Sequence, residues 1–258
     1  MSDIMQTLLK HLSRFFFLLV ISLNLSCTIK PDDLSRDTSI TEIMRLAERA
    51  NNRNSFDEAG DFYMEVDRLY PYSDKSREAL VEAMKSYHKG TDLSNARLAA
   101  TRYLQLYPRG PDADFAQYMI GLTFFDAIVD VRRDQGAALN AVRELKKFIS
   151  DHPTSSYSQL VDEKLRISYS QLAGQEMSVG RYYMKREEYL AAISRFTVVI
   201  TEYAETIFAE EAFYRLTEAY YALGMRDMAI ENNQFFSKNF PKSDLTDKSN
   251  KLVSKLKL

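Results

Sequence analysis

The sequence is poor in cysteine, glycine and proline, and it lacks an excess of positive charge. It has one cysteine, so no disulfide can form within the chain. Its 258 residues include only 8 glycines and 6 prolines, which favours a mostly helical fold with few irregular loops. Lysine and arginine (34) nearly balance aspartate and glutamate (36). The strongly basic face of a nucleic-acid-binding protein is therefore not expected.

No apolar run near the N-terminus is long enough to span a bilayer. Lys10 and Arg14 precede a short apolar run at 15–21, whereas a membrane-spanning helix needs roughly 20 apolar residues. A positive segment, a short apolar segment and a small residue before a cleavage point are typical of a secretory signal peptide. We predict a signal peptide over residues 1–26, directly before Cys27.

Cys27, in this position, resembles the cysteine of the bacterial lipobox, which becomes the lipidated first residue of the mature protein. Ser26 fits that motif, whereas Asn24 stands where Leu or a similar residue is usual. The resemblance implies an acylated Cys27 that holds the protein on a membrane, since each buried methylene contributes about 0.8 kcal/mol. A secreted protein with a free thiol and a failed membrane anchor remain as alternatives.

The first residues after the cysteine differ from the rest of the chain. Residues 27–38 are polar and include Pro31, which predicts a flexible tether. From Ser39 on, apolar residues recur at helical spacing. Ser39 itself is a candidate helix N-cap, because Glu42 follows three residues later.

A spacing of twelve residues between an alanine and a proline, or in one copy a second alanine, recurs five times. The pairs are Ala59/Pro71, Ala96/Pro108, Ala141/Pro153, Ala192/Ala204 and Ala229/Pro241. A ring precedes the second position every time, and these rings are Tyr70, Tyr107, His152, Tyr203 and Phe240. Such self-similarity is typical of stacked helical hairpins, which form binding surfaces rather than catalytic pockets.

The same pattern predicts an all-α fold, an α-solenoid of about five tetratricopeptide-like helical hairpins. After a first helix that starts at Ser39 and breaks at 51–54, helices are expected over 56–69, 75–88, 93–106, 112–128, 135–150, 157–185, 188–202, 207–223, 226–239 and 245–256. The prolines then fall just beyond helix ends, and the serine or threonine two residues on can cap the next helix.

Two of the intervals between repeats are longer than the others, and each predicts an insertion. The first contains 126–134, which we interpret as a loop inside the third hairpin. The second makes 156–186 a helix of roughly 45 Å. This long helix would link N-terminal repeats one to three (39–155) to repeats four and five and a last helix, within 156–258.

Between Asp130 and Arg195 the chain shows a narrower resemblance. Arg133-Asp134-Gln135, the run from His152 to Tyr157, and Tyr182-Tyr183-Met184-Lys185-Arg186 resemble the BamD family. These are lipoproteins of the outer-membrane β-barrel assembly machine. The resemblance implies an anchored scaffold on the periplasmic side of the outer membrane. Its implied partners are the barrel-forming subunit BamA, other lipoproteins of the machine and unfolded outer-membrane proteins.

The resemblance also implies an interface with the barrel subunit on the C-terminal hairpins. Arg195 aligns with an arginine that the family places at this interface. The other interface candidates are Glu176, Tyr183, Arg186, Arg132, Arg133 and Asp134. Alternatives remain open for them: Arg195 as a solvated side chain, Glu176 and Arg186 bonded within the chain, and Asp134 as a helix cap.

The N-terminal hairpins would receive the C-terminal strand signal of a client in a groove of rings. The candidates for this groove are Phe62, Tyr63, Tyr103 and Tyr107. Rings at helical spacing also fill protein cores, so core packing is the alternative for each of them.

Motifs of catalysis are absent from the sequence. The predicted signal peptide contains His11, which leaves His88 and His152. There is no Gly-x-Ser-x-Gly, no P-loop, no His-Glu-x-x-His and no cysteine pair. We therefore predict a scaffold that is not an enzyme and has no cofactor or metal. The rival hypothesis is another envelope tetratricopeptide lipoprotein, such as a pilus-assembly pilotin or a cell-wall coordination factor.

Overall fold

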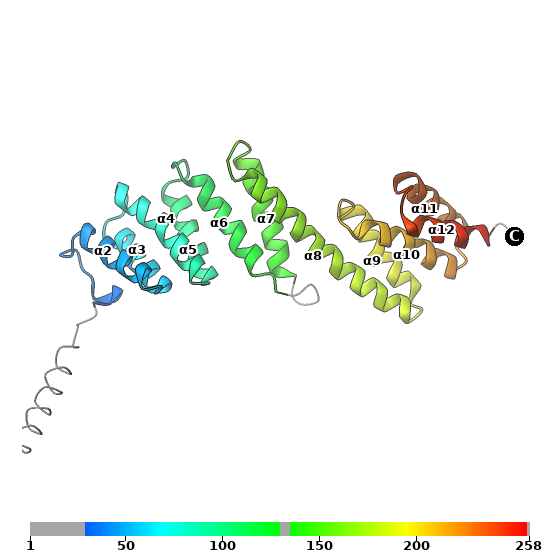
Figure 1. The fold of residues 1–258 in the computed structure, drawn as a ribbon, viewed down its shortest axis with the longest axis horizontal. Helices are drawn as coiled ribbons and strands as arrows, with labels where there is room; N and C mark the ends of the chain where they lie inside the picture. The colour runs from blue at the N-terminus through cyan, green and yellow to red at the C-terminus, as the bar shows by residue number, and fades with distance from the viewer. Residues whose placement is uncertain (1–28, 130–134, 257–258) are drawn as a thin grey trace, which may run out of the picture.

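Helices in one elongated row make up the protein (Figure 1). The structure is a computed structural model that describes residues 29–129 and 135–256, and it contains no β-strand within those ranges. The elements are η1 (Pro31–Asp33), α2 (Ile40–Asn52), α3 (Phe56–Leu69), α4 (Asp74–Lys89), α5 (Leu93–Leu106), α6 (Ala113–Asp126), α7 (Gly136–Asp151), α8 (Ser158–Lys185), α9 (Tyr189–Glu202), α10 (Ala209–Ala222), α11 (Arg226–Asn239) and α12 (Asp244–Ser254). The predicted all-α solenoid is confirmed, with helix bounds within two residues of those expected.

The twelve-residue spacing has a direct structural meaning. The five alanines that begin it are fully buried, so neighbouring helices approach closely at these points. The five rings are the C-caps of α3, α5, α7, α9 and α11, with φ between −133° and −126°. Each ring residue donates its backbone N–H to the carbonyl four residues earlier. The ring therefore marks the end of each helix, and the following proline starts the turn.

The predicted caps are confirmed where a serine directly precedes a helix. Ser39 accepts a hydrogen bond from the Glu42 N–H and starts α2. Ser73 does the same for α4, accepting from the Ser76 N–H at 3.0 Å. In the copies with Ser155 and Thr206, the next helix begins a few residues later, so those side chains are not N-caps.

The helices bury two separate apolar cores that share α8. One core runs from Leu34 to Val161 and contains α2 to α7 with the first part of α8. The other runs from Ala173 to Ala229 and contains the second part of α8 with α9 to α11. In Figure 1, α8 crosses diagonally from one group of helices to the other. The assignment of three repeats to one side and two to the other remains a prediction.

The segment expected to be a flexible tether is packed against the first hairpin, which corrects that prediction for its described part. Leu34 is buried in the N-terminal core. The Arg68 guanidinium donates to the Leu34 carbonyl at 3.2 Å. The Tyr70 hydroxyl donates to the carbonyls of Arg36 at 2.9 Å and Thr38 at 2.7 Å. We call residues 31–38 the docked segment.

Cys27 and the predicted signal peptide lie outside the described residues. Within the ranges that the structure describes, none of the helices combines the length and the apolar character needed to cross a membrane.

Candidate partner-binding surface

The predicted interface residues Arg195 and Glu176 are brought together by the packing of α9 on α8. Arg195 Nη1 lies 3.2 Å from Glu176 Oε2. The Arg195 side chain is 44% exposed and that of Glu176 is 16% exposed. Arg195 is thus accessible to solvent, which is compatible both with a partner contact and with a solvated side chain, while Glu176 is bonded within the chain.

The turn between α8 and α9 carries two more of the predicted residues. Arg186 is the C-cap of α8, and its Nε donates to Glu188 Oε1 at 2.7 Å. This hydrogen bond raises the pKa of Arg186. Tyr183 is half-buried and packs on the C-terminal core. Arg186 therefore remains charged and exposed, while Tyr183 mainly fixes the turn.

Two exposed apolar side chains beside this turn were missed by the sequence reasoning. Tyr182 is 54% exposed and Leu190 is 70% exposed. Leu190 stands two residues before Ala192, the alanine of the twelve-residue spacing. The five copies of the repeat can therefore be compared at this position. The equivalent residues of the five copies are Asp57, Ser94, Leu139, Leu190 and Asp227. A leucine at this position, which is polar in three copies, indicates a surface with a partner.

We define the α8–α9 surface as Glu176, Tyr182, Tyr183, Arg186, Leu190 and Arg195. The predicted loop residues Arg132, Arg133 and Asp134 lie outside the described residues, between α6 and α7. Their role as a contact loop stays a prediction.

The rings predicted to line a client groove are for the most part core residues. Phe62, Tyr63 and Tyr103 are buried, so the prediction of an accessible groove is wrong for them. The Tyr103 hydroxyl also accepts from the Asp112 N–H at 3.1 Å, which satisfies its polar end. Tyr107 is half-buried, with its ring centroid 5.5 Å from that of Tyr103. Only Tyr107 of the four is positioned to contact a client without repacking.

No group of metal-ligating side chains gathers in the part of the chain that the structure describes. What the α8–α9 surface offers instead is one accessible guanidinium with an exchangeable partner, a second exposed arginine and two apolar side chains. This arrangement suits recognition of an acidic and partly apolar protein surface.

Comparison with known proteins gives one family. A family model described as YfiO, outer membrane lipoprotein, matches residues 36–235. The outer membrane protein assembly factor BamD of Caulobacter vibrioides is 36% identical over 190 residues, which is 74% of this chain and 62% of that protein. The factor of the same name in Neisseria meningitidis serogroup A is 29% identical over 224 residues, 83% of this chain and 84% of that protein.

More distant matches are similar in coverage. BamD of Vibrio cholerae is 25% identical over 232 residues, 86% of this chain and 96% of that protein. Among solved structures, that of the MamA protein covers 79% of this chain and 92% of its own at 18% identity, with a TM-score of 0.35.

Proposed function

Because the chain belongs to the YfiO family of outer membrane lipoproteins, we propose that it is a scaffold of the machinery that assembles β-barrel proteins in the outer membrane. The observation that carries this proposal is the match over residues 36–235, which includes all the buried residues of both cores except Leu34. The similar proteins are named outer membrane protein assembly factors. A scaffold performs no bond chemistry, so its contribution is to hold other chains in place.

The proposed anchor is an acylated Cys27, which would place the helices on the periplasmic side of the outer membrane. The proposed partners are a barrel-forming subunit similar to BamA, further lipoproteins of the machine, and unfolded outer-membrane proteins. Client binding belongs to the N-terminal hairpins, where Tyr107 is the predicted ring that remains accessible.

The α8–α9 surface is the proposed contact with the barrel subunit. In the free protein Arg195 pairs with Glu176, whose carboxylate is only 16% exposed. A partner carboxylate can share the Arg195 guanidinium, because the bond to Glu176 uses only one of its five N–H donors. Tyr182 and Leu190 add apolar area that a free chain leaves exposed.

The test is co-purification of the barrel subunit with Arg195→Leu from detergent-solubilised outer membranes. We expect the recovered barrel subunit to fall about tenfold, equivalent to about 1.4 kcal/mol. Circular dichroism should show unchanged helical content, because an ion pair with this exposure contributes little to stability.

The matched control is Arg143→Leu on α7, which removes an exposed arginine that is paired with Glu144 at 2.9 Å. We expect normal recovery with this variant. Equal recovery with both variants would remove Arg195 from the interface. Crosslinks in intact cells that reach only pilus components would overturn the proposed function itself.

A further inference from the structure

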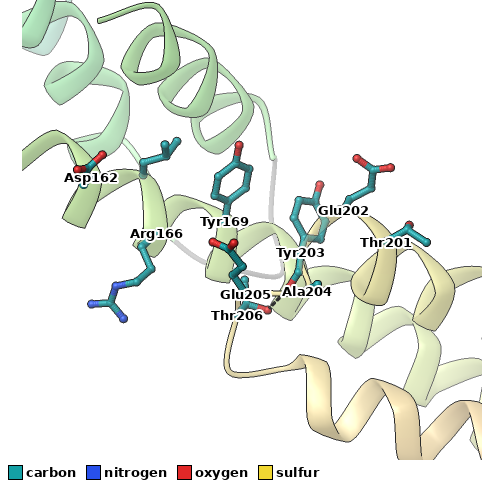
Figure 2. A pocket seen from close by; sticks show the side chains of 10 residues that line it. Asp162, Arg166, Tyr169, Thr201, Glu202, Tyr203, Ala204, Glu205 and Thr206 are labelled. Atoms are coloured by element: carbon teal, nitrogen blue, oxygen red, sulfur yellow. Dashed lines mark hydrogen bonds between the residues drawn. The ribbon is translucent and has the colours of Figure 1, made fainter. Parts of the chain in front are cut away.

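A recess of about 570 Å³ lies beside the middle of α8, at the point where the two cores separate (Figure 2). One wall is a stripe of α8 that includes Leu165, Arg166 and Tyr169, whose spacing puts them on one side of the helix. The other wall is the end of α9 and the turn into α10, residues 201–206. The recess exists because α7 packs on the first part of α8 while α9 packs on the second.

The turn that lines this recess is the one repeat copy without proline. Ala204 follows the ring residue Tyr203, whereas the other four copies have proline at that position. The backbone also differs, since ψ of the ring residue is 31° here and 54° to 58° in the other copies. Ala204 is exposed, and among the described residues its N–H has no hydrogen-bond partner. The recess therefore contains a main-chain donor that proline would eliminate.

The charges around the recess are predominantly negative. Asp162, Glu202 and Glu205 line it together with a single arginine, Arg166. Within the described ranges these three carboxylates form no ion pair, whereas Glu211 on the neighbouring helix pairs with Arg181 and Arg215. Three carboxylates against one arginine give the lining a net negative charge, which favours a cation there.

Two rings form the inner part of the recess. The centroids of Tyr169 and Tyr203 are 6.0 Å apart, at an interplanar angle of 45°. Burial raises the pKa of the Tyr203 hydroxyl, and the carboxylates of Glu176 and Glu202 raise it further. The Tyr203 hydroxyl thus stays neutral, and the faces of the two rings can contact the stem and the charged head of a long basic side chain.

We propose that this recess binds an extended segment of a partner polypeptide through an arginine side chain. The guanidinium lies against the Tyr169 and Tyr203 rings and faces Glu202 and Glu205. A carbonyl of the segment accepts the Ala204 N–H. The recess adjoins the α8–α9 surface, since Glu176 acts on the Tyr203 hydroxyl, but it shares no residue with that surface, and the inference does not depend on the proposed function.

The experiment measures fluorescence anisotropy of a short labelled peptide of serine and valine with a central pair of arginines, against the same peptide with glutamates. The protein is the full chain in detergent. We expect the arginine peptide to bind and the glutamate peptide to bind at least about tenfold more weakly, with the difference decreasing as salt screens the charges.

Charge reversal then localises the binding. We expect the double variant Glu202→Lys with Glu205→Lys to weaken binding of the arginine peptide at least about tenfold. The control is Glu210→Lys with Asp227→Lys, which changes the net charge equally at two exposed residues that do not line the recess. The control should change affinity less than about twofold. Equal affinity of the two peptides, or equal effects of the two double variants, would overturn the proposal.

Ala204→Pro tests the main-chain contact with little risk to folding, since the same turn contains proline in the other four copies. We expect about threefold weaker binding of the arginine peptide and an unchanged melting temperature. Unaltered binding would overturn the contact to the Ala204 N–H. Arg195→Leu should not weaken binding of the peptide, because it removes a neighbouring positive charge and no residue of the recess. Failure of this inference and failure of the proposed interface can therefore be told apart.

Discussion

The N-terminal hairpins and the C-terminal part of the chain share the same repeat but differ in how many large apolar side chains they leave exposed. The large apolar side chains that α8 to α11 and their turns leave exposed are Leu160, Tyr182, Leu190, Ile207, Leu223, Met225, Met228 and Phe235. Over 39–155, within the described residues, they are Tyr72, Leu98, Val129 and Leu139. The difference indicates that the N-terminal hairpins bury most of their large apolar side chains in their own core. The C-terminal part leaves more of them exposed, where other chains can contact them.

Two ion pairs between helices, one in each part of the chain, differ in how far they are exposed and bonded. Asp67 on α3 is bonded both by Arg102 Nε at 2.8 Å and by the Ser76 hydroxyl at 2.7 Å, and its side chain is 5% exposed. Glu176 on α8 is more exposed and is bonded to Arg195 alone among the described residues. The first pair is part of the structure, whereas the second can be exchanged with a partner.

Removing an equivalent core ring from each part should give the largest effect. Phe148 on α7 and Phe236 on α11 are fully buried and occupy the same repeat position, four residues before the C-cap ring. We expect Phe148→Ala and Phe236→Ala each to cost about 3–5 kcal/mol of unfolding free energy. Because the cores are separate, Phe236→Ala should unfold the C-terminal helices first. Urea denaturation followed by hydrogen exchange for each helix measures this.

Loss of protection across the whole chain at one urea concentration in both variants would contradict two cores. It would mean instead that α8 couples the two parts into a single cooperative unit.

The two ion pairs should differ in their contribution to stability. Arg102→Leu leaves the buried Asp67 carboxylate with the Ser76 hydroxyl alone, and we expect a loss of about 2 kcal/mol. Arg195→Leu should cost less than about 1 kcal/mol, because its partner can be reached by water. Thermal unfolding of the two variants, at low and high salt, measures the difference. Equal losses would remove the distinction between a structural and an exchangeable pair.

The most local effect is expected at the docked segment. Tyr70→Phe removes the hydroxyl that donates to Arg36 and Thr38, at a cost of about 1 kcal/mol confined to this segment. Amide exchange of residues 34–38 should become faster, with global unfolding little changed. Tyr203→Phe changes the C-cap ring of another repeat copy and is the matched control. If Tyr70→Phe leaves the exchange rates unaltered, burial of Leu34 holds the segment by itself.

The helices could be predicted because each marker of the repeat has a local role. Alanine at Ala59 and its equivalents is needed where backbones meet, and the ring at Tyr70 and its equivalents ends a helix. Such roles are visible within one window of sequence. The residue Leu190 shows that the same alignment of copies also detects a surface, because one position changes from polar to apolar.

The remaining features depend on contacts between distant parts of the chain. Arg68 bonds to Leu34, and Tyr70 bonds to Arg36, across 34 residues in each case. A polar segment with one apolar residue therefore predicts a tether when it is considered alone. Burial of Phe62 and Tyr103 depends on which side of each helix meets the next one. The recess beside α8 depends on where along that helix the packing of α7 stops and the packing of α9 starts. No single short stretch of sequence contains this information.

The docked segment also limits how far the hairpins can be from a lipid bilayer. Leu34 comes seven positions after Cys27, and an extended chain covers about 3.5 Å per position. With acyl chains on Cys27, as proposed, the first hairpin is held within about 25 Å of the lipid headgroups. A client bound by the N-terminal hairpins, as proposed, would then be held beside the bilayer in which it must finally reside.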